Sequence, residues 1–224
     1  MSFRNQSLGE IAASIPGATR LFREYDLDFC CGGTAILADA AAAKGLNLDE
    51  IISRLTELQN SRPSFEGQDW RVASYADTIE HILARYHQRH REQLQELILL
   101  GEKVEQVHGA RPDAPLGVTA ELKNIYASLD SHMMKEEQIL FPMINAGSYA
   151  TARMPIHVMM MEHDEEREHI EKLKSLTNNL TLPADACSSW TALYRGIGEF
   201  IDDLMHHIHT ENNILFPRVL AESA

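Results

Sequence analysis

Two segments of this sequence carry the same pattern of potential metal ligands. His132 precedes Glu136 by four residues, His207 precedes Glu211 by the same step, and Ile-Leu-Phe-Pro follows in both segments. Residues four apart lie on one face of an α-helix, about 6 Å apart along its axis. Each pair can therefore present an imidazole and a carboxylate to one point. A single pair is a weak signal, because a surface ion pair has the same spacing, but two copies in matching apolar contexts indicate a metal site.

Two further histidines complete this set. His87 and His163 are each followed, four residues later, by arginine and then glutamate. These matched spacings indicate two similar helical hairpins related by a pseudo-twofold axis, with one more imidazole ligand from each. The alternative is a duplicated core whose histidines only form hydrogen bonds. That alternative would bury carboxylates and imidazoles without a compensating charge, which is costly.

The predicted ligand set leaves room for a reaction at the metals. Two six-coordinate irons offer about 12 positions, and both imidazole and carboxylate suit iron. The histidines, two bridging glutamates and an oxo or hydroxo bridge fill about ten of these positions. About one position on each metal then stays open to water or a small ligand, as a reactive site requires. Manganese and zinc accept the same ligand types.

Two neighbours of the ligands are weaker candidates for a role at the centre. His90 lies three residues after His87, and Glu162 directly precedes His163. Both are candidates for hydrogen-bonding the ligands from outside the metal centre. We assign no catalytic residue beyond the centre itself.

The apolar periodicity predicts the elements that carry these ligands. Apolar residues recur at steps of three and four, as on the buried face of a helix, and segments rich in glycine and proline separate the runs. The expected helices cover residues 74–107, 118–145, 152–177 and 186–220. Short loops between long amphipathic helices imply antiparallel neighbours. The predicted fold class is therefore all-α, with an up-down-up-down four-helix bundle.

A small helical domain is expected before the bundle. Ser7 and Glu10 have the spacing of a capping box, Pro16-Gly17 interrupts that helix, and Gly45 ends an alanine-rich helix. A following stretch has little apolar periodicity and reads as a linker. The predicted boundaries are 1–58 for the N-terminal domain, 59–72 for the linker and 73–224 for the bundle.

The cysteines leave two interpretations open. Cys30 and Cys31 are adjacent and precede Gly32-Gly33. Neighbouring cysteines rarely bridge each other without strain, and three cysteines do not build a disulfide framework. The pair is either buried in a tight turn or a candidate for a redox or iron relay through thiolates. Cys187 is expected to be structural.

Charge and composition exclude some partners. The net charge is −13, so nucleic acid and anionic membranes are poor candidates for binding. No apolar run approaches the roughly 20 residues of a membrane helix, and the N-terminus lacks an apolar signal segment. We expect a cytoplasmic protein, and the sequence leaves a homodimer open.

The motifs of the chain resemble those of a known family. They are Asp-Phe-Cys-Cys-Gly-Gly at 28–33, Arg-Tyr-His-Gln-Arg-His at 85–90, Ser-His-Met-Met-Lys-Glu-Glu-Gln-Ile-Leu-Phe-Pro at 131–142, Glu-His-Asp at 162–164 and Glu-Asn-Asn-Ile-Leu-Phe-Pro at 211–217. The chain resembles the RIC (repair of iron centres) proteins, the YtfE/ScdA type of iron–sulfur cluster repair protein.

The resemblance implies an ScdA-type N-terminal domain and a hemerythrin-like bundle with a μ-oxo-bridged centre of two iron ions. It also implies terminal ligation by the matched histidines and bridging by Glu136 and Glu211. Oxygen-carrying hemerythrin has a second histidine on the third helix, where this chain has Arg167. This departure removes a ligand and argues against plain reversible oxygen carriage.

The implied role is repair of iron–sulfur proteins damaged by oxidative and nitrosative stress. Repair would proceed by iron donation or by removal of NO. Two alternatives remain open from the sequence: a di-iron nitric oxide reductase, which the open coordination positions favour, and a non-catalytic hemerythrin-like sensor that binds O2 or NO. The latter predicts a signalling domain, and the sequence offers only the small N-terminal unit.

Overall fold

The computed structural model describes residues 3–60 and 68–222, and its regular elements within these ranges are all helical. In chain order they are η1 (Phe3–Asn5), α1 (Leu8–Ser14), α2 (Ala18–Glu24), α3 (Leu37–Ala43), α4 (Leu48–Asn60), α5 (Tyr75–Ile82), η2 (Leu83–His87), α6 (Gln88–His108), α7 (Val118–Lys135), η3 (Glu136–Leu140), α8 (Phe141–Asn145), α9 (Tyr149–Leu176), α10 (Ser188–Thr210), η4 (Glu211–Leu215) and α11 (Phe216–Glu222). The predicted all-α class is confirmed.

The chain divides into two compact units. One comprises residues 1–78 and 206–224, and the other comprises residues 79–205. The division falls inside α10, which is one continuous helix. The predicted boundaries at 58 and 73 remain a prediction, and residues 61–67 of the predicted linker lie outside the described residues.

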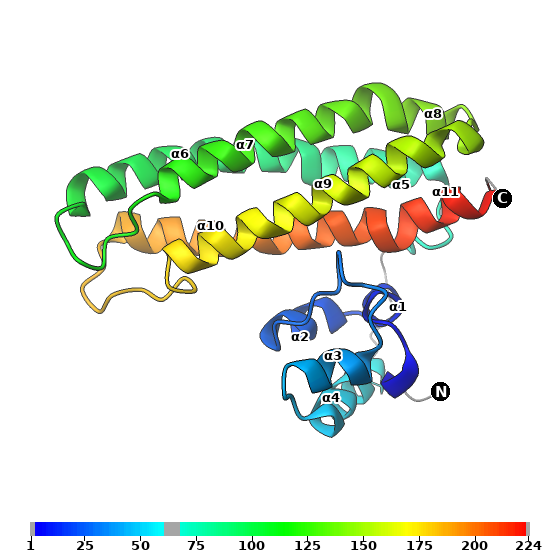
Figure 1. Ribbon diagram of the computed structural model, residues 1–224, viewed down its shortest axis with the longest axis horizontal. Helices are drawn as coiled ribbons and strands as arrows, with labels where there is room; N and C mark the ends of the chain where they lie inside the picture. Colours follow the sequence, from blue (N-terminus) through cyan, green and yellow to red (C-terminus); the bar gives the residue numbers. More distant parts are fainter. Residues whose placement is uncertain (1–2, 61–67, 223–224) are drawn as a thin grey trace. The chain divides into compact units, whose positions relative to one another are not determined.

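Long helices build the unit of residues 79–205. In Figure 1, α6, α7, α9 and α10 lie side by side, and short loops join successive helices. This arrangement agrees with the predicted four-helix bundle. Large side chains fill its core, among them Trp190 and Phe200, which are fully buried. Burial of one such side chain stabilises the fold by about 1.5–3 kcal/mol.

Polar contacts fix the helices of this unit relative to one another. Arg85 donates two hydrogen bonds to the carboxylate of Asp203, at 3.1 and 2.6 Å, and joins η2 to α10. Glu121 on α7 is almost fully buried and accepts hydrogen bonds from His169 and Lys172 on α9, at 2.6 and 2.5 Å. Because both contacts join different helices, they help to determine the register of the bundle.

Single π-helical turns interrupt three of the long helices. The amide of Phe141 donates to the carbonyl of Glu136, five residues earlier, and Phe216 donates to Glu211 in the same way. A proline follows each phenylalanine; it has no amide hydrogen and its ring clashes with the carbonyl four residues earlier. The wider turn relieves that clash. No proline explains η2, but π turns occur frequently at functional sites.

Short helices form the N-terminal part of the other unit. The hydroxyl of Ser7 accepts the amide of Glu10 at 3.2 Å, and the Glu10 carboxylate accepts the amide of Ser7 at 3.2 Å. The predicted capping box is therefore confirmed. Gly17 precedes α2 with φ +86°, a left-handed conformation that glycine adopts without strain, and the predicted break at Pro16-Gly17 is also confirmed.

The side chain of Asn213 ties η4 to the N-terminal segment of the same unit. Its amide donates to the carbonyls of Phe29 and Cys30, at 3.2 and 3.0 Å. A Cβ at Gly9 would overlap the Asn213 carboxamide oxygen and lie 2.8 Å from its carbon, and a Cβ at Gly33 would meet the same group. Both positions therefore need glycine, because the Asn213 side chain lies too close for a Cβ atom.

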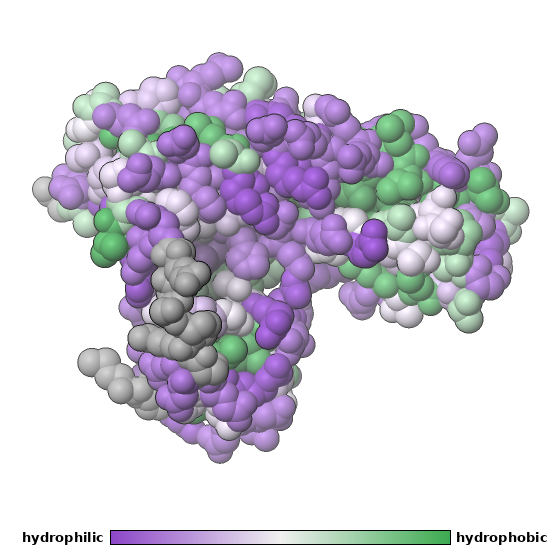
Figure 2. Space-filling view, turned by 180° about the vertical axis from the view of Figure 1, so that it is seen from behind, coloured by the Kyte–Doolittle hydropathy of each residue, from purple (hydrophilic) through white to green (hydrophobic). Residues whose placement is uncertain are grey.

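The surface is mostly hydrophilic. On the face drawn in Figure 2, apolar areas gather towards the right-hand end, which is the left-hand end in Figure 1, where the loop between α6 and α7 lies. Exposed apolar side chains near that loop include Val107 and Leu116. Among the helices of the described residues, none combines the length and the hydropathy of a membrane span.

The contact of Asn213 with Gly9 predicts strong energetic coupling. We expect Gly9→Ala to lower the free energy of unfolding by about 1–3 kcal/mol, because the added methyl displaces a hydrogen-bonded carboxamide. In the Asn213→Ala background, the same change should cost at least about 1 kcal/mol less. Chemical denaturation of the four proteins in the double-mutant cycle measures this coupling.

Gly198→Ala is the matched control. Its Cβ would lie 3.4 Å from the nearest atom outside the helix backbone, an ordinary contact, so helix propensity should make this change neutral or stabilising. Additive effects of Gly9→Ala and Asn213→Ala would contradict the close approach.

Candidate metal centre

Four of the predicted ligands lie within the unit of residues 79–205. The carboxylate of Glu136, at the start of η3, has Oε2 at 3.4 Å from Nε2 of His87 and at 3.4 Å from Nε2 of His132. The Nε2 atoms of His132 and His163 are 3.1 Å apart. All four side chains are buried. Three helices thus direct imidazole nitrogens and a carboxylate into one water-excluded volume.

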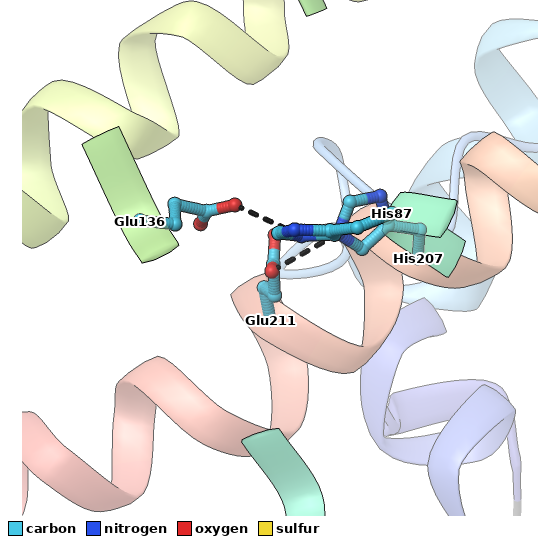
Figure 3. Close-up of side chains that lie close together, drawn as sticks. All are labelled: His87, Glu136, His207 and Glu211. Carbon is cyan, nitrogen blue, oxygen red and sulfur yellow. Dashed lines mark hydrogen bonds and ion pairs between the residues drawn. The ribbon is translucent and has the colours of Figure 1, made fainter. Parts of the chain in front are cut away.

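The remaining pair lies on the fourth helical segment. Nε2 of His207, in the last turn of α10, lies 3.1 Å from Oε1 of Glu211, the first residue of η4. Helical spacing thus brings this pair together as predicted. His87, Glu136, His207 and Glu211 each offer a ligand atom within 4.8 Å of the others (Figure 3). A second such group consists of His132, Glu136, His163 and Glu211.

The chemistry of these donors fits a metal centre. The side chains provide only imidazole nitrogens and carboxylate oxygens, which suit iron and other first-row metals. Glu136 and Glu211 are completely buried. Removing ionised carboxylates from water costs several kcal/mol each unless a positive charge compensates them. A bound cation would supply that charge.

An outer carboxylate orients His87. Its Nδ1–H donates to Oε1 of Glu137 at 2.8 Å, and this tautomer leaves Nε2 with a lone pair. Arg91 donates to the same oxygen at 2.8 Å and to Asp130 at 2.7 Å. Burial alone raises the pKa of Glu137, but the hydrogen bonds from Arg91 and His87 lower it below its ordinary value. Glu137 therefore stays ionised and holds the ring.

A second outer carboxylate orients His132. Its Nδ1–H donates to Oε2 of Glu162 at 2.9 Å, and Lys135 donates to the other oxygen. The hydrogen bond from His132 is the main cause that lowers the pKa of Glu162 to about 2, and Lys135 assists against the effect of burial. Glu162 thus has the position expected of an outer hydrogen-bond partner.

Other predicted site residues lie elsewhere. His90 is buried and stacks on Tyr86 with ring centroids 6.2 Å apart, and its edge contacts Phe200. Neither group of candidate ligands found among the described residues includes His90. Cys30 is buried and Cys31 is half-exposed in the loop between α2 and α3, and neither belongs to those groups.

Two features of the site escaped the sequence reasoning. Glu137 orients His87 and Arg91 holds Glu137, although no spacing pattern in the sequence links these separate helices. Glu166, three residues after His163, is also buried; burial raises its pKa, and the Ser128 hydroxyl donates to it at 2.7 Å. A signal existed for Glu137 alone, because the acid adjoins a predicted ligand where the second repeat has Asn212.

The chain matches known protein families over most of its length. Residues 78–219 match the hemerythrin HHE cation binding domain, and residues 4–59 match ScdA_N, a domain of unknown function (DUF542). A probable iron–sulfur cluster repair protein of Haemophilus influenzae is 66% identical over 222 residues, which are 99% of this chain and 100% of that protein. The chain belongs to the family of iron–sulfur cluster repair proteins.

Relatives from other bacteria are similar over the same length. The iron–sulfur cluster repair protein YtfE of Escherichia coli O81 is 55% identical over 221 residues, 99% of each chain. YtfE of Pectobacterium atrosepticum is 54% identical over 220 residues, 98% of this chain and 99% of that one. The predicted family is thereby confirmed. A hemerythrin-like domain with buried histidine and glutamate groups suits a di-iron site.

The contact of Glu137 with His87 predicts a change in metal affinity. We expect Glu137→Gln to weaken iron binding by about tenfold or more, because loss of an orienting carboxylate lowers the basicity of the imidazole and frees its ring. Competition with a calibrated chelator measures the affinity. Glu96→Gln, at an exposed position on α6, is the control and should bind iron as the unaltered protein does. An unchanged affinity in Glu137→Gln would show that this carboxylate has no influence on the metal.

Proposed function

We propose that this protein uses a di-iron centre to repair iron–sulfur clusters damaged by oxidative and nitrosative stress, by donating iron, by removing NO, or by both. The observation that carries the proposal is the pair of overlapping ligand groups that share Glu136 and Glu211. Repair proteins of Haemophilus influenzae and Escherichia coli match this chain over nearly its whole length. Its partners would be damaged iron–sulfur proteins and small ligands such as NO or O2.

The two irons would each take two histidines. His87 and His207 belong to one ligand group, and His132 and His163 belong to the other. Glu136 and Glu211 belong to both groups, which supports a bridging role for each carboxylate. An oxo or hydroxo bridge would complete the centre. When bound, such a centre supplies redox-active metals with positions open to a small ligand.

The chain's own side chains keep this centre ready for ligands. Glu137 and Glu162 hold two imidazoles through their Nδ1 atoms, so these rings cannot rotate away from the metals. Arg167 stands where hemerythrin has an additional histidine. Its side chain is exposed and therefore adds no ligand to the buried site. Apolar packing around the ligands excludes water, which strengthens the electrostatic contacts inside.

Release of iron as a substrate for damaged clusters requires that the bridges open. Protons compete with metals for carboxylate and imidazole ligands, so protonation of Glu136 or Glu211 would weaken the hold on both metals together. Lys135 and Arg91 donate hydrogen bonds to the outer acids Glu162 and Glu137 and keep them ionised, so these acids do not take up the proton at ordinary pH.

Cys30 and Cys31 remain candidates for a redox or iron relay. The amide of Asn213 binds the carbonyl of Cys30 two residues after Glu211, so the cysteine loop attaches to the turn that carries one proposed bridge. The hydrogen bond with Cys31 and burial both raise the pKa of Cys30 well above its ordinary value. Cys30 is therefore held as a thiol, and Cys31, which is half-exposed, is the member that can meet a partner.

The bridging proposal predicts the metal content of variants. We expect Glu136→Ala and Glu211→Ala to bind fewer than two irons per chain, because loss of one bridge affects both metals. His90→Ala, which removes a buried imidazole outside the ligand groups, should keep its full iron content. Metal analysis of proteins purified from iron-replete cells, together with the optical spectrum of an oxo-bridged ferric pair, provides the measurement. Two irons in both glutamate variants would show that the bridges are assigned wrongly.

A repair assay tests the function itself. The iron-loaded protein should restore the activity of a dehydratase whose [4Fe–4S] cluster was damaged by NO or peroxide, and it should do so faster than an equal amount of free ferrous iron. Glu136→Ala is expected to lose this advantage, and His90→Ala is expected to retain it. Nitrous oxide in the headspace, after NO is added to the reduced protein, distinguishes NO removal from iron donation. A protein that never exceeds free iron and produces no gas would refute the proposal.

A further inference from the structure

A thiol and an imidazole meet at the far end of the bundle, where α6 ends and α10 begins. Nε2 of His108 lies 3.1 Å from Sγ of Cys187. Both side chains are half-exposed. The ring of His108 packs on Trp190, with centroids 5.1 Å apart, and Trp190 is completely buried. The imidazole is therefore fixed by the core on one side and contacts the sulfur on the other.

Cys187 lies at the start of a long helix. Cys187 directly precedes α10, a helix of 23 residues, and its carbonyl accepts the amide of Thr191 at 3.0 Å. The amides and dipole at a helix N-terminus stabilise a negative charge there. His108 can accept the thiol proton on Nε2, after which Nε2–H donates to the thiolate. The pair thus combines a nucleophile with an adjacent base.

Other ionisable groups near the pair are already engaged. Arg111 lies over the ring of Trp190, 5.3 Å from its centroid, and donates hydrogen bonds to Asp113 and Asp185 at 2.8–2.9 Å. Tyr194 packs against Trp190, and burial raises its pKa. The single positive charge of Arg111 offsets only one of these two carboxylate charges, so activation of Cys187 must come from its direct contact with His108.

We propose that Cys187 is a reactive thiol, positioned and activated by His108, which forms mixed disulfides with small disulfides produced under oxidative conditions. The thiolate attacks one sulfur of the small disulfide, a new S–S bond forms to Cys187, and the old S–S bond breaks. The other sulfur leaves as a thiolate and takes the proton that His108 received from Cys187. Exchange consumes one disulfide and forms one, so no further oxidant is required. Cys187 is thus a modification site rather than a structural cysteine.

The contrast with Cys30 makes the prediction specific. Cys30 is buried, and its neighbours raise its pKa, so it should exchange slowly. At pH 7 we expect Cys187 of the iron-loaded protein to react with bis(2-hydroxyethyl) disulfide about fivefold faster than the cysteine of a short unstructured peptide. Peptide mass spectrometry at timed intervals assigns the adduct to each cysteine. A rate no faster than that of the peptide would overturn the proposal.

Variants test the role of His108. His108→Asn should reduce the exchange rate of Cys187 to about that of the free peptide and should change the pH dependence of that rate, because the adjacent base is lost. His157→Asn, at an exposed position on α9, is the matched control and should leave rate and profile unchanged. Circular dichroism and iron content confirm that each variant is folded. If folded His108→Asn kept the same exchange rate and pH profile, activation by His108 would be refuted. The comparison of the wild-type protein with the peptide tests the reactivity of Cys187 without any variant.

Discussion

The buried carboxylates of Glu136 and Glu211 need a positive charge, and this requirement constrains the rest of the structure. An ionised carboxylate away from water is stable only when a cation or strong donors compensate it. Here imidazole Nε2 atoms lie 3.1–3.4 Å from carboxylate oxygens in the contacts of His87, His132 and His207, and Nε2 of a ring that donates through Nδ1 has a lone pair and supplies no positive charge. Long helices supply a framework that can hold such ligands in register. The family match to a cation binding domain agrees with this electrostatic reasoning.

The two repeated halves of the sequence perform different tasks around this centre. After Glu136, the next residue is Glu137, which orients His87 from outside. After Glu211, the next residue is Asn212, whose side-chain amide donates to the carbonyl of Cys30 at 3.5 Å, and its neighbour Asn213 donates to the same carbonyl at 3.0 Å. A neutral carboxamide can donate to backbone carbonyls, whereas a carboxylate cannot. The change from acid to amide therefore accounts for the different contacts of two turns that share the same backbone form.

The thiols are divided by their surroundings in a comparable way. Cys30 is buried beside Cys31, and this proximity keeps its proton bound. Cys187 is half-exposed and contacts a histidine at the start of a long helix. Burial and a neighbouring thiol oppose ionisation of Cys30, whereas the imidazole beside Cys187 gives that thiol an adjacent base. Side chains of one chemical type thus meet different chemical surroundings in this fold.

Local patterns in the sequence determined the helices and the types of ligand. Apolar spacing predicted four long helices, the Ser7–Glu10 capping box was correct, and the step from His132 to Glu136 indicated one shared face. These features depend on residues within a few positions of one another, so helical geometry alone predicts them. The six predicted ligands come together in the structure, and their metal-binding role remains a prediction.

Only the tertiary structure decided which distant side chains meet. The contacts of Glu137 with His87, of Asn213 with Cys30 and of His108 with Cys187 join different helices or loops. Nothing in the sequence indicated that Cys187 would contact His108. Such contacts depend on the register and rotation of packed helices, which arise from the shape of the whole core rather than from any short run of residues.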